Sequence, residues 1–268
     1  MAKRTLRGLA GALSALVLFA LAAAYAHGGP VPVLRLVENT RVGPYALIPA
    51  EESSAASALR TVNDCFSEYP QGFFELLNRE DGLALILVGG MERVLPDCPA
   101  EAAAFTCTEG GRTLIILDCS GQISRWTIMH EVCHAIDRRL ARLGEEGVID
   151  WSEEEWLALC PEGFSYHNAY VDAEGREIGV FGSAEYTAEG EGEPWFINRY
   201  SRTFPTEDRA VLFETLMRAG SGAEYLKSPH VIAKLSRYFE AIRMGFGGKW
   251  KSGSAFWEKR LETLLAGG

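Results

Sequence analysis

One stretch of the chain constrains its fold more than any other: residues 127–137 read T-I-M-H-E-V-C-H-A-I-D and contain the pattern H-E-x-x-H. Because no proline or glycine interrupts residues 123–143 and apolar residues recur at helical spacing, the sequence predicts a helix here. On a helix, His130 and His134 leave the same face one turn apart, which suits two nitrogen ligands on one zinc ion. Glu131 is then placed to act as a general base toward a water molecule beside the metal.

The first 26 residues have the three parts of a secretory signal peptide. A basic start precedes an apolar run of about 15 residues, and the pattern A-x-A follows at residues 24–26. We therefore expect residues 1–26 to be a cleaved signal peptide and residues 27–268 to form a single secreted, extracytoplasmic domain. The alternative is a retained membrane anchor, because the apolar run is near the lower limit for spanning a bilayer.

The charge balance argues against two classes of partner. The formal net charge is −10, and the basic residues form no stripe along the chain. Nucleic acid and anionic membranes are therefore poor candidates as partners. We expect a monomer that has no stable membrane association after the signal peptide is removed.

The chain contains six cysteines, at positions 65, 98, 107, 119, 133 and 160. An even number in an exported chain suggests disulfide bonds. Cys98 and Cys107 are close enough in sequence to close a small loop. A bond from Cys133 to Cys119 or Cys160 would fix the motif helix to its neighbours. Buried free thiols are the alternative.

The segments around the motif predict an α+β fold. Residues 83–88 and 113–118 are apolar runs next to glycine pairs, which is typical of buried strands. The second run immediately precedes the motif helix, and its free edge could bind an extended peptide. The other predicted segments are an extended stretch at 27–45, a helical region at 50–78, a loop or short ribbon at 172–194, and helices at roughly 207–218, 222–244 and 253–265. Strands followed by a mainly helical C-terminal half indicate α+β.

Two histidines do not complete a catalytic zinc site, which needs a third protein ligand and one position open to water. Leu140 stands where an extended histidine motif would require its third histidine. His167 and His230 are better explained as surface or core residues. The remaining candidates are Glu207 and Asp208, in the first turn of the helix that Pro205 favours. The alternative is that both acids only complement the helix dipole.

The motif followed by A-I-D, together with Y-x-x-x-x-P-x-E-D-x-A at residues 200–210, resembles the gluzincin-type zinc peptidases related to anthrax toxin lethal factor. It is similar also to the secreted Pro-Pro endopeptidases, and the resemblance covers roughly residues 120–220. In that group a tyrosine lies seven residues before the glutamate that binds zinc. The resemblance therefore implies that Glu207, and not Asp208, is the third ligand, with Tyr200 as the preceding tyrosine.

What the resemblance implies is a zincin-like fold and a secreted zinc metalloendopeptidase with one Zn²⁺ ion and a peptide or protein substrate. His130, His134 and Glu207 would hold the ion. Glu131 would be the general base, and Tyr200 would donate to the oxyanion. The alternative is a catalytically weak or inactive zincin-like module with an extracellular binding or structural role.

Three further residues bear on these two interpretations. Val211 stands where many relatives carry a further glutamate, so any role of that residue is absent here or is taken by Glu214. Asp137, three residues after His134, lies on the ligand face. It could accept an imidazole N–H, or it is simply a solvated acid on the helix surface.

Overall fold

The computed structural model describes residues 31–95, 98–99, 102–171, 178, 193–218, 226–247 and 256–266. These residues form two compact units: one runs up to Phe66 and resumes over Phe74–Ile128, and the other comprises Ser67–Phe73 and the chain from Met129 onward. The predicted signal peptide and most of the predicted loop at 172–194 lie outside the described residues. The single domain over 27–268 stays a prediction. No helix among the described residues is long and apolar enough to cross a membrane.

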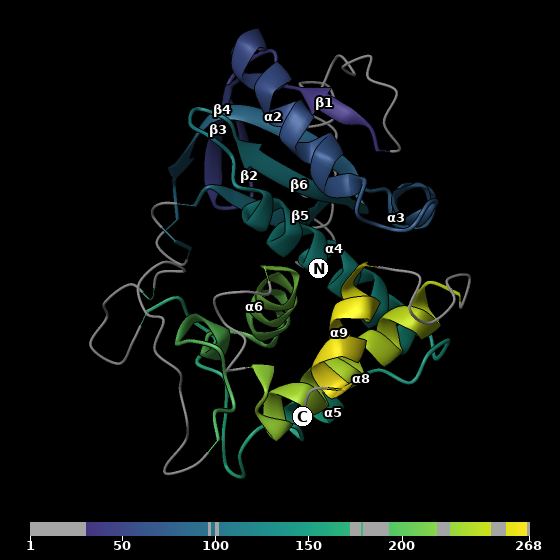
Figure 1. Cartoon of the computed structure of the whole chain (residues 1–268). Helices are drawn as coiled ribbons and strands as arrows, with labels where there is room; N and C mark the ends of the chain where they lie inside the picture. Colours follow the sequence, from purple (N-terminus) through teal and green to yellow (C-terminus); the bar gives the residue numbers. More distant parts are fainter. Residues whose placement is uncertain are drawn as a thin grey trace, which may run out of the picture. The chain divides into compact units, whose positions relative to one another are not determined.

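The first unit is built on a six-stranded mixed sheet (Figure 1). Its strands are β1 (Val33–Arg35), β2 (Thr40–Val42), β3 (Tyr45–Pro49), β4 (Ala84–Arg93), β5 (Ala104–Glu109) and β6 (Arg112–Asp118). The order across the sheet is β2-β3-β4-β6-β5, and β1 pairs with β4. The β1–β4 and β4–β6 pairs are parallel, with Leu85 of β4 opposite Val33 of β1 and Ile115 of β6. The β2–β3, β3–β4 and β5–β6 pairs are antiparallel.

The two apolar runs predicted as strands are the centre of this sheet. The first half of β4 and residues 114–117 of β6 are fully buried. Parallel strands covered on both faces require such continuous apolar sequence, because neither face meets water. Helix α2 (Glu52–Phe66) lies across one face of the sheet (Figure 1), and α3 (Phe73–Asp81) follows it.

Three details of the first unit differ from the sequence predictions. The helical region at 50–78 is two helices, because Pro70 and Gly72, whose φ is +83°, lie in the turn between them. Strand β5 was not predicted. Because β5 pairs with β6 along its length, β6 is flanked on both sides and has no free edge for a peptide.

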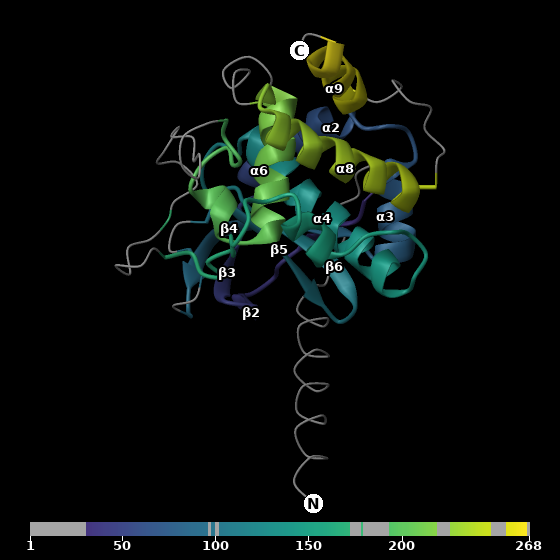
Figure 2. The ribbon, with the colours of Figure 1, turned by 90° about the horizontal axis from the view of Figure 1, so that it is seen from below.

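The second unit is helical, as predicted for the C-terminal half. Helix α4 (Arg125–Glu145) begins in the first unit and continues into the second. It is followed by α5 (Glu153–Leu157), the 3₁₀ helix η1 (Tyr200–Arg202), α6 (Pro205–Arg218), α8 (Pro229–Gly245) and α9 (Phe256–Ala266). Figures 1 and 2 both place α6 beside α4. Mixed strands and helices in this order make the chain α+β.

Contacts within the second unit fix the position of α4. Gly245 of α8 lies against Leu140 of α4 so closely that a Cβ atom at Gly245 would clash with the leucine side chain. The buried Arg139 of α4 donates a hydrogen bond from Nε to the Gly245 carbonyl oxygen at 2.9 Å. The motif helix is therefore held at close range by α8, on a different face from its two motif histidines.

Candidate metal centre

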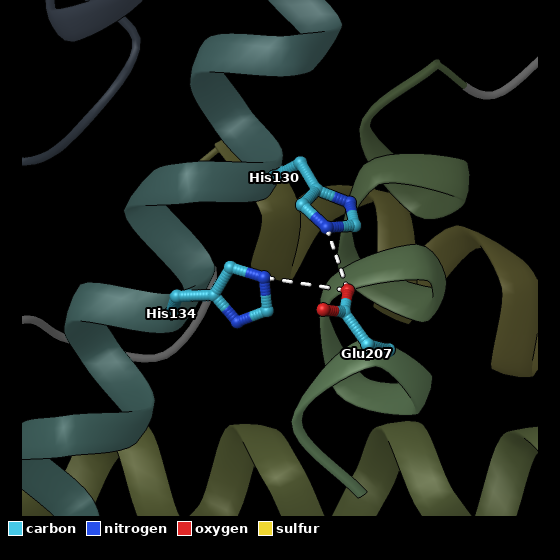
Figure 3. Close-up of side chains that lie close together, drawn as sticks. All are labelled: His130, His134 and Glu207. Atoms are coloured by element: carbon cyan, nitrogen blue, oxygen red, sulfur yellow. Dashed lines mark hydrogen bonds and ion pairs between the residues drawn. The ribbon is translucent and has the colours of Figure 1, made fainter. Parts of the chain in front are cut away.

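The two motif histidines project from α4 one turn apart, as the helical spacing predicts. Their ring centroids are 4.8 Å apart, and His130 is buried. Between them, Val132 and Cys133 are fully buried in the protein interior. Because these apolar residues fix the rotation of the helix, the histidine face is directed toward α6 (Figure 3).

Glu207 reaches both histidines from the first turn of α6, which begins at Pro205 as predicted. Its Oε2 atom lies 3.0 Å from His130 Nε2 and 3.4 Å from His134 Nε2 (Figure 3). One ligand atom from each of these three residues lies within 4.8 Å of the others. The structure thus brings together the three residues named as ligands, and this group can hold a metal ion.

The charges in this cluster favour a carboxylate beside protonated imidazole. Burial opposes the charged form of His130, but the hydrogen bond with Glu207 and the nearby carboxylate of Glu214 outweigh it and raise the pKa of His130 to about 10. Burial would likewise raise the pKa of Glu207, but the charges and hydrogen bonds of His134 and His130 lower it well below its usual value. A cation bound among these groups would replace the proton held on the His130 imidazole.

The two residues named for catalysis border the same cluster. Tyr200 lies in η1, is buried, and has its ring centroid 6.3 Å from that of His130. Burial raises the pKa of the Tyr200 phenol well above its usual value, and the charge of Glu131 acts in the same direction. Glu131 is itself buried, and its charge also raises the pKa of His130. Glu131 and Tyr200 are therefore within electrostatic reach of the ligand group.

A second tyrosine in this cluster was missed by the sequence analysis. The Tyr170 hydroxyl donates a hydrogen bond to Glu207 Oε1 at 2.8 Å. Its ring stacks on that of Tyr200, with centroids 5.9 Å apart and an interplanar angle of 27°. Tyr170 is 37 residues from Glu207 in the chain and belongs to no motif, so the sequence carries no signal that could have identified it.

Glu214 lies beside His130, where the sequence analysis left open whether a further carboxylate is present. Its Oε2 atom lies 3.5 Å from His130 Nδ1, the ring nitrogen on the far side from Glu207. Arg218 pairs with the other carboxylate oxygen of Glu214 at 3.2 Å. Val211 is buried. Of the two possibilities stated above, the structure supports the one in which Glu214 supplies the further carboxylate.

Asp208 is directed away from the metal cluster. Its Oδ2 atom accepts hydrogen bonds from Lys234 Nζ at 2.7 Å and from the Tyr166 hydroxyl at 2.8 Å. The side chains of Asp208 and Lys234 are both fully buried. The adjacent acids of α6 therefore have different environments, because neighbouring helical residues point about 100° apart.

Asp137 is not the solvated surface acid that was one of the two roles considered for it. It is buried rather than solvated, and its Oδ2 atom accepts a hydrogen bond from Arg209 Nε at 2.7 Å. Arg209 also donates to Glu153 Oε1 at 2.8 Å. The guanidinium of Arg209, extending from α6, is the partner of Asp137 Oδ2, and an imidazole partner for Asp137 stays a prediction.

Neither His167, His230 nor the cysteines belong to the ligand group among the residues that the structure describes. His230 stacks on Trp195, with ring centroids 3.4 Å apart, and only the backbone amide of His167 has a described hydrogen bond. Cys98, Cys119, Cys133 and Cys160 are free thiols, so the disulfides considered for Cys98 and Cys133 are not formed. Cys133 lies instead 2.9 Å from the Tyr238 hydroxyl, which occupies the space that a second sulfur would need.

The chain was compared with known proteins by family, by sequence and by structure. No protein-family model, no curated protein and no solved structure matches it.

Proposed function

We propose that this protein is a secreted zinc-dependent metalloendopeptidase with a zincin-like fold of the gluzincin type. The observation that carries the proposal is the convergence of His130, His134 and Glu207 next to the H-E-x-x-H glutamate. A leader with the features of a signal peptide supports an extracytoplasmic location. The proposed partner is a peptide or protein substrate, and the proposed state is a monomer.

The donor set supports zinc as the metal. Two imidazole nitrogens and one carboxylate oxygen are the ligands of a common class of catalytic zinc site, which leaves a fourth position for water. Ligand atoms at about 2.0–2.2 Å from a tetrahedral zinc ion lie roughly 3.3–3.6 Å from one another. The distance from Glu207 Oε2 to His134 Nε2, 3.4 Å, falls within that range, and the distance to His130 Nε2, 3.0 Å, is shorter because the two atoms share a hydrogen bond.

Zinc, when bound, supplies a Lewis acid that polarises the scissile carbonyl group and acidifies water. The protein supplies the proton transfers. Glu131 accepts a proton from the attacking water and later delivers it to the leaving amine. The high pKa of Tyr200 keeps its phenol protonated at neutral pH, so that it can donate a hydrogen bond to the oxyanion. Removal of such a donor typically lowers kcat by about two to three orders of magnitude.

The proposal is tested with purified protein and unfolded casein. We expect cleavage products, their loss when zinc is removed with a chelator, and their return when one equivalent of zinc is added back. Cleavage that persists without zinc would exclude the proposal.

The same experiment distinguishes the alternative, a zincin-like binding or structural module. A module of that kind would bind zinc in a 1:1 ratio and cleave neither casein nor a peptide library. Glu214 weakens the reason for this alternative, because it supplies a carboxylate beside His130 although Val211 does not.

A further inference from the structure

Two oxygens of Glu207 have separate partners. Oε2 is directed at the Nε2 atoms of His130 and His134, at 3.0 and 3.4 Å. Oε1 accepts the hydrogen bond from the Tyr170 hydroxyl at 2.8 Å. The buried carboxylate therefore presents one oxygen to the histidines and has the other already engaged.

Tyr170 is itself held in place by aromatic contacts. Its ring lies 4.8 Å from the ring of Phe204, the residue before α6, and stacks on Tyr200 at 5.9 Å. A hydroxyl on a ring fixed from two sides has a narrow range of positions, so its hydrogen bond restricts the rotation of the carboxylate. The same stack connects Tyr170 to the tyrosine proposed as oxyanion donor.

From these contacts we propose that Tyr170 is a positioning residue that makes Glu207 a one-oxygen zinc ligand and keeps the fourth position open for water. The inference rests on the proposed function, since it assigns a role relative to the zinc ion. Without the hydroxyl, Oε1 would lose the hydrogen bond from Tyr170 and would be less restrained from turning toward the metal and competing with water for the fourth position. Outer partners of this kind typically contribute about 10–100-fold to metal affinity or activity.

The test compares the purified full-length chain with Tyr170→Phe, which removes the hydroxyl and keeps the stacked ring. Tyr238→Phe is the matched control, because it removes a hydroxyl that contacts Cys133 and not the ligand group. Zinc affinity is measured by competition with a chromophoric chelator. The visible absorption of the Co²⁺-substituted proteins reports the coordination of the metal. We expect Tyr170→Phe to weaken zinc binding about tenfold or more and to change the Co²⁺ spectrum toward higher coordination. The control should leave both unchanged.

The outcomes separate the inference from the function. If Tyr170→Phe matches the wild type in zinc affinity and in Co²⁺ spectrum, the role of Tyr170 is excluded while the zinc site stands. If the wild type binds no zinc, the proposed function fails first. If Tyr170→Phe does not fold, a crystal structure of the zinc-loaded wild type decides the question. Binding of zinc by one oxygen of Glu207, with Oε1 hydrogen-bonded to Tyr170, supports the inference. Binding of zinc by both oxygens of Glu207 overturns it.

Discussion

Arg209 of α6 donates a hydrogen bond to Asp137 of α4 at 2.7 Å, and so links the two helices that carry the candidate metal ligands. Both side chains are buried, and Arg209 extends the link to Glu153 of α5. Asp137 lies three residues after His134, and Arg209 two residues after Glu207. The ion pair therefore joins the helices within one turn of a ligand on each side.

Arg209→Met is expected to destabilise the fold by about 3–5 kcal/mol, because it leaves the Asp137 carboxylate buried without its cation. Urea denaturation measures the change. The control is Arg142→Met, whose partner Glu146 is exposed, and which should change stability by roughly 1 kcal/mol or less. Equal effects from the two variants would show that the buried pair does not hold the helices together.

Glu207→Ala is expected to abolish tight zinc binding, because it removes one of the three candidate ligands, whose Oε2 atom lies 3.0 and 3.4 Å from the two imidazole Nε2 atoms. Stoichiometry from zinc titration checks this result, and circular dichroism checks that the variant is folded. Full 1:1 binding by Glu207→Ala, with loss in Asp208→Ala, would reverse the assignment of the ligand.

Asp208→Ala is expected to lower stability rather than metal binding. The sequence suggested a cost of about 1 kcal/mol for a lost helix-end contact. The structure indicates about 3–5 kcal/mol, because Lys234 would remain fully buried without its counter-charge. Thermal or urea unfolding provides the measurement, and a loss near 1 kcal/mol would show that water or another group compensates Lys234.

Glu214→Gln is expected to weaken zinc binding about tenfold, because a carboxylate beside Nδ1 makes the imidazole of His130 a more basic ligand. The exposed Glu240 of α8 offers the matched control, Glu240→Gln, which should bind zinc as the wild type does. A Glu214→Gln variant with unchanged zinc affinity would show that its position beside His130 has no effect on the ligand.

The parts of the fold and site that local sequence determines were predictable. The shared face of His130 and His134 follows from helical periodicity, and the buried centres of β4 and β6 follow from continuous apolar runs. The residues alone left Glu207 and Asp208 open as the third ligand, and only the family resemblance favoured Glu207, whose carboxylate lies 3.0 Å from His130 Nε2. Each of these patterns involves residues that are close together in the sequence.

The parts that depend on distant partners were not predictable. Tyr170 meets Glu207 across 37 residues, and Asp137 meets Arg209 across 72. Only the packed fold decides which polar side chain reaches a buried charge. Strand β5 was missed for a related reason: its residues are mostly half-buried, so they lack the continuous apolar pattern of the central strands.

The most direct test of the central claim is a peptide-library cleavage assay on the wild type beside Glu131→Gln and the exposed control Glu154→Gln, all loaded with one equivalent of zinc. The account predicts that all three proteins bind zinc. The wild type and Glu154→Gln should cleave the same peptides, whereas Glu131→Gln should cleave them about 10²–10⁴-fold more slowly. Cleavage by zinc-loaded Glu131→Gln at the wild-type rate would contradict it.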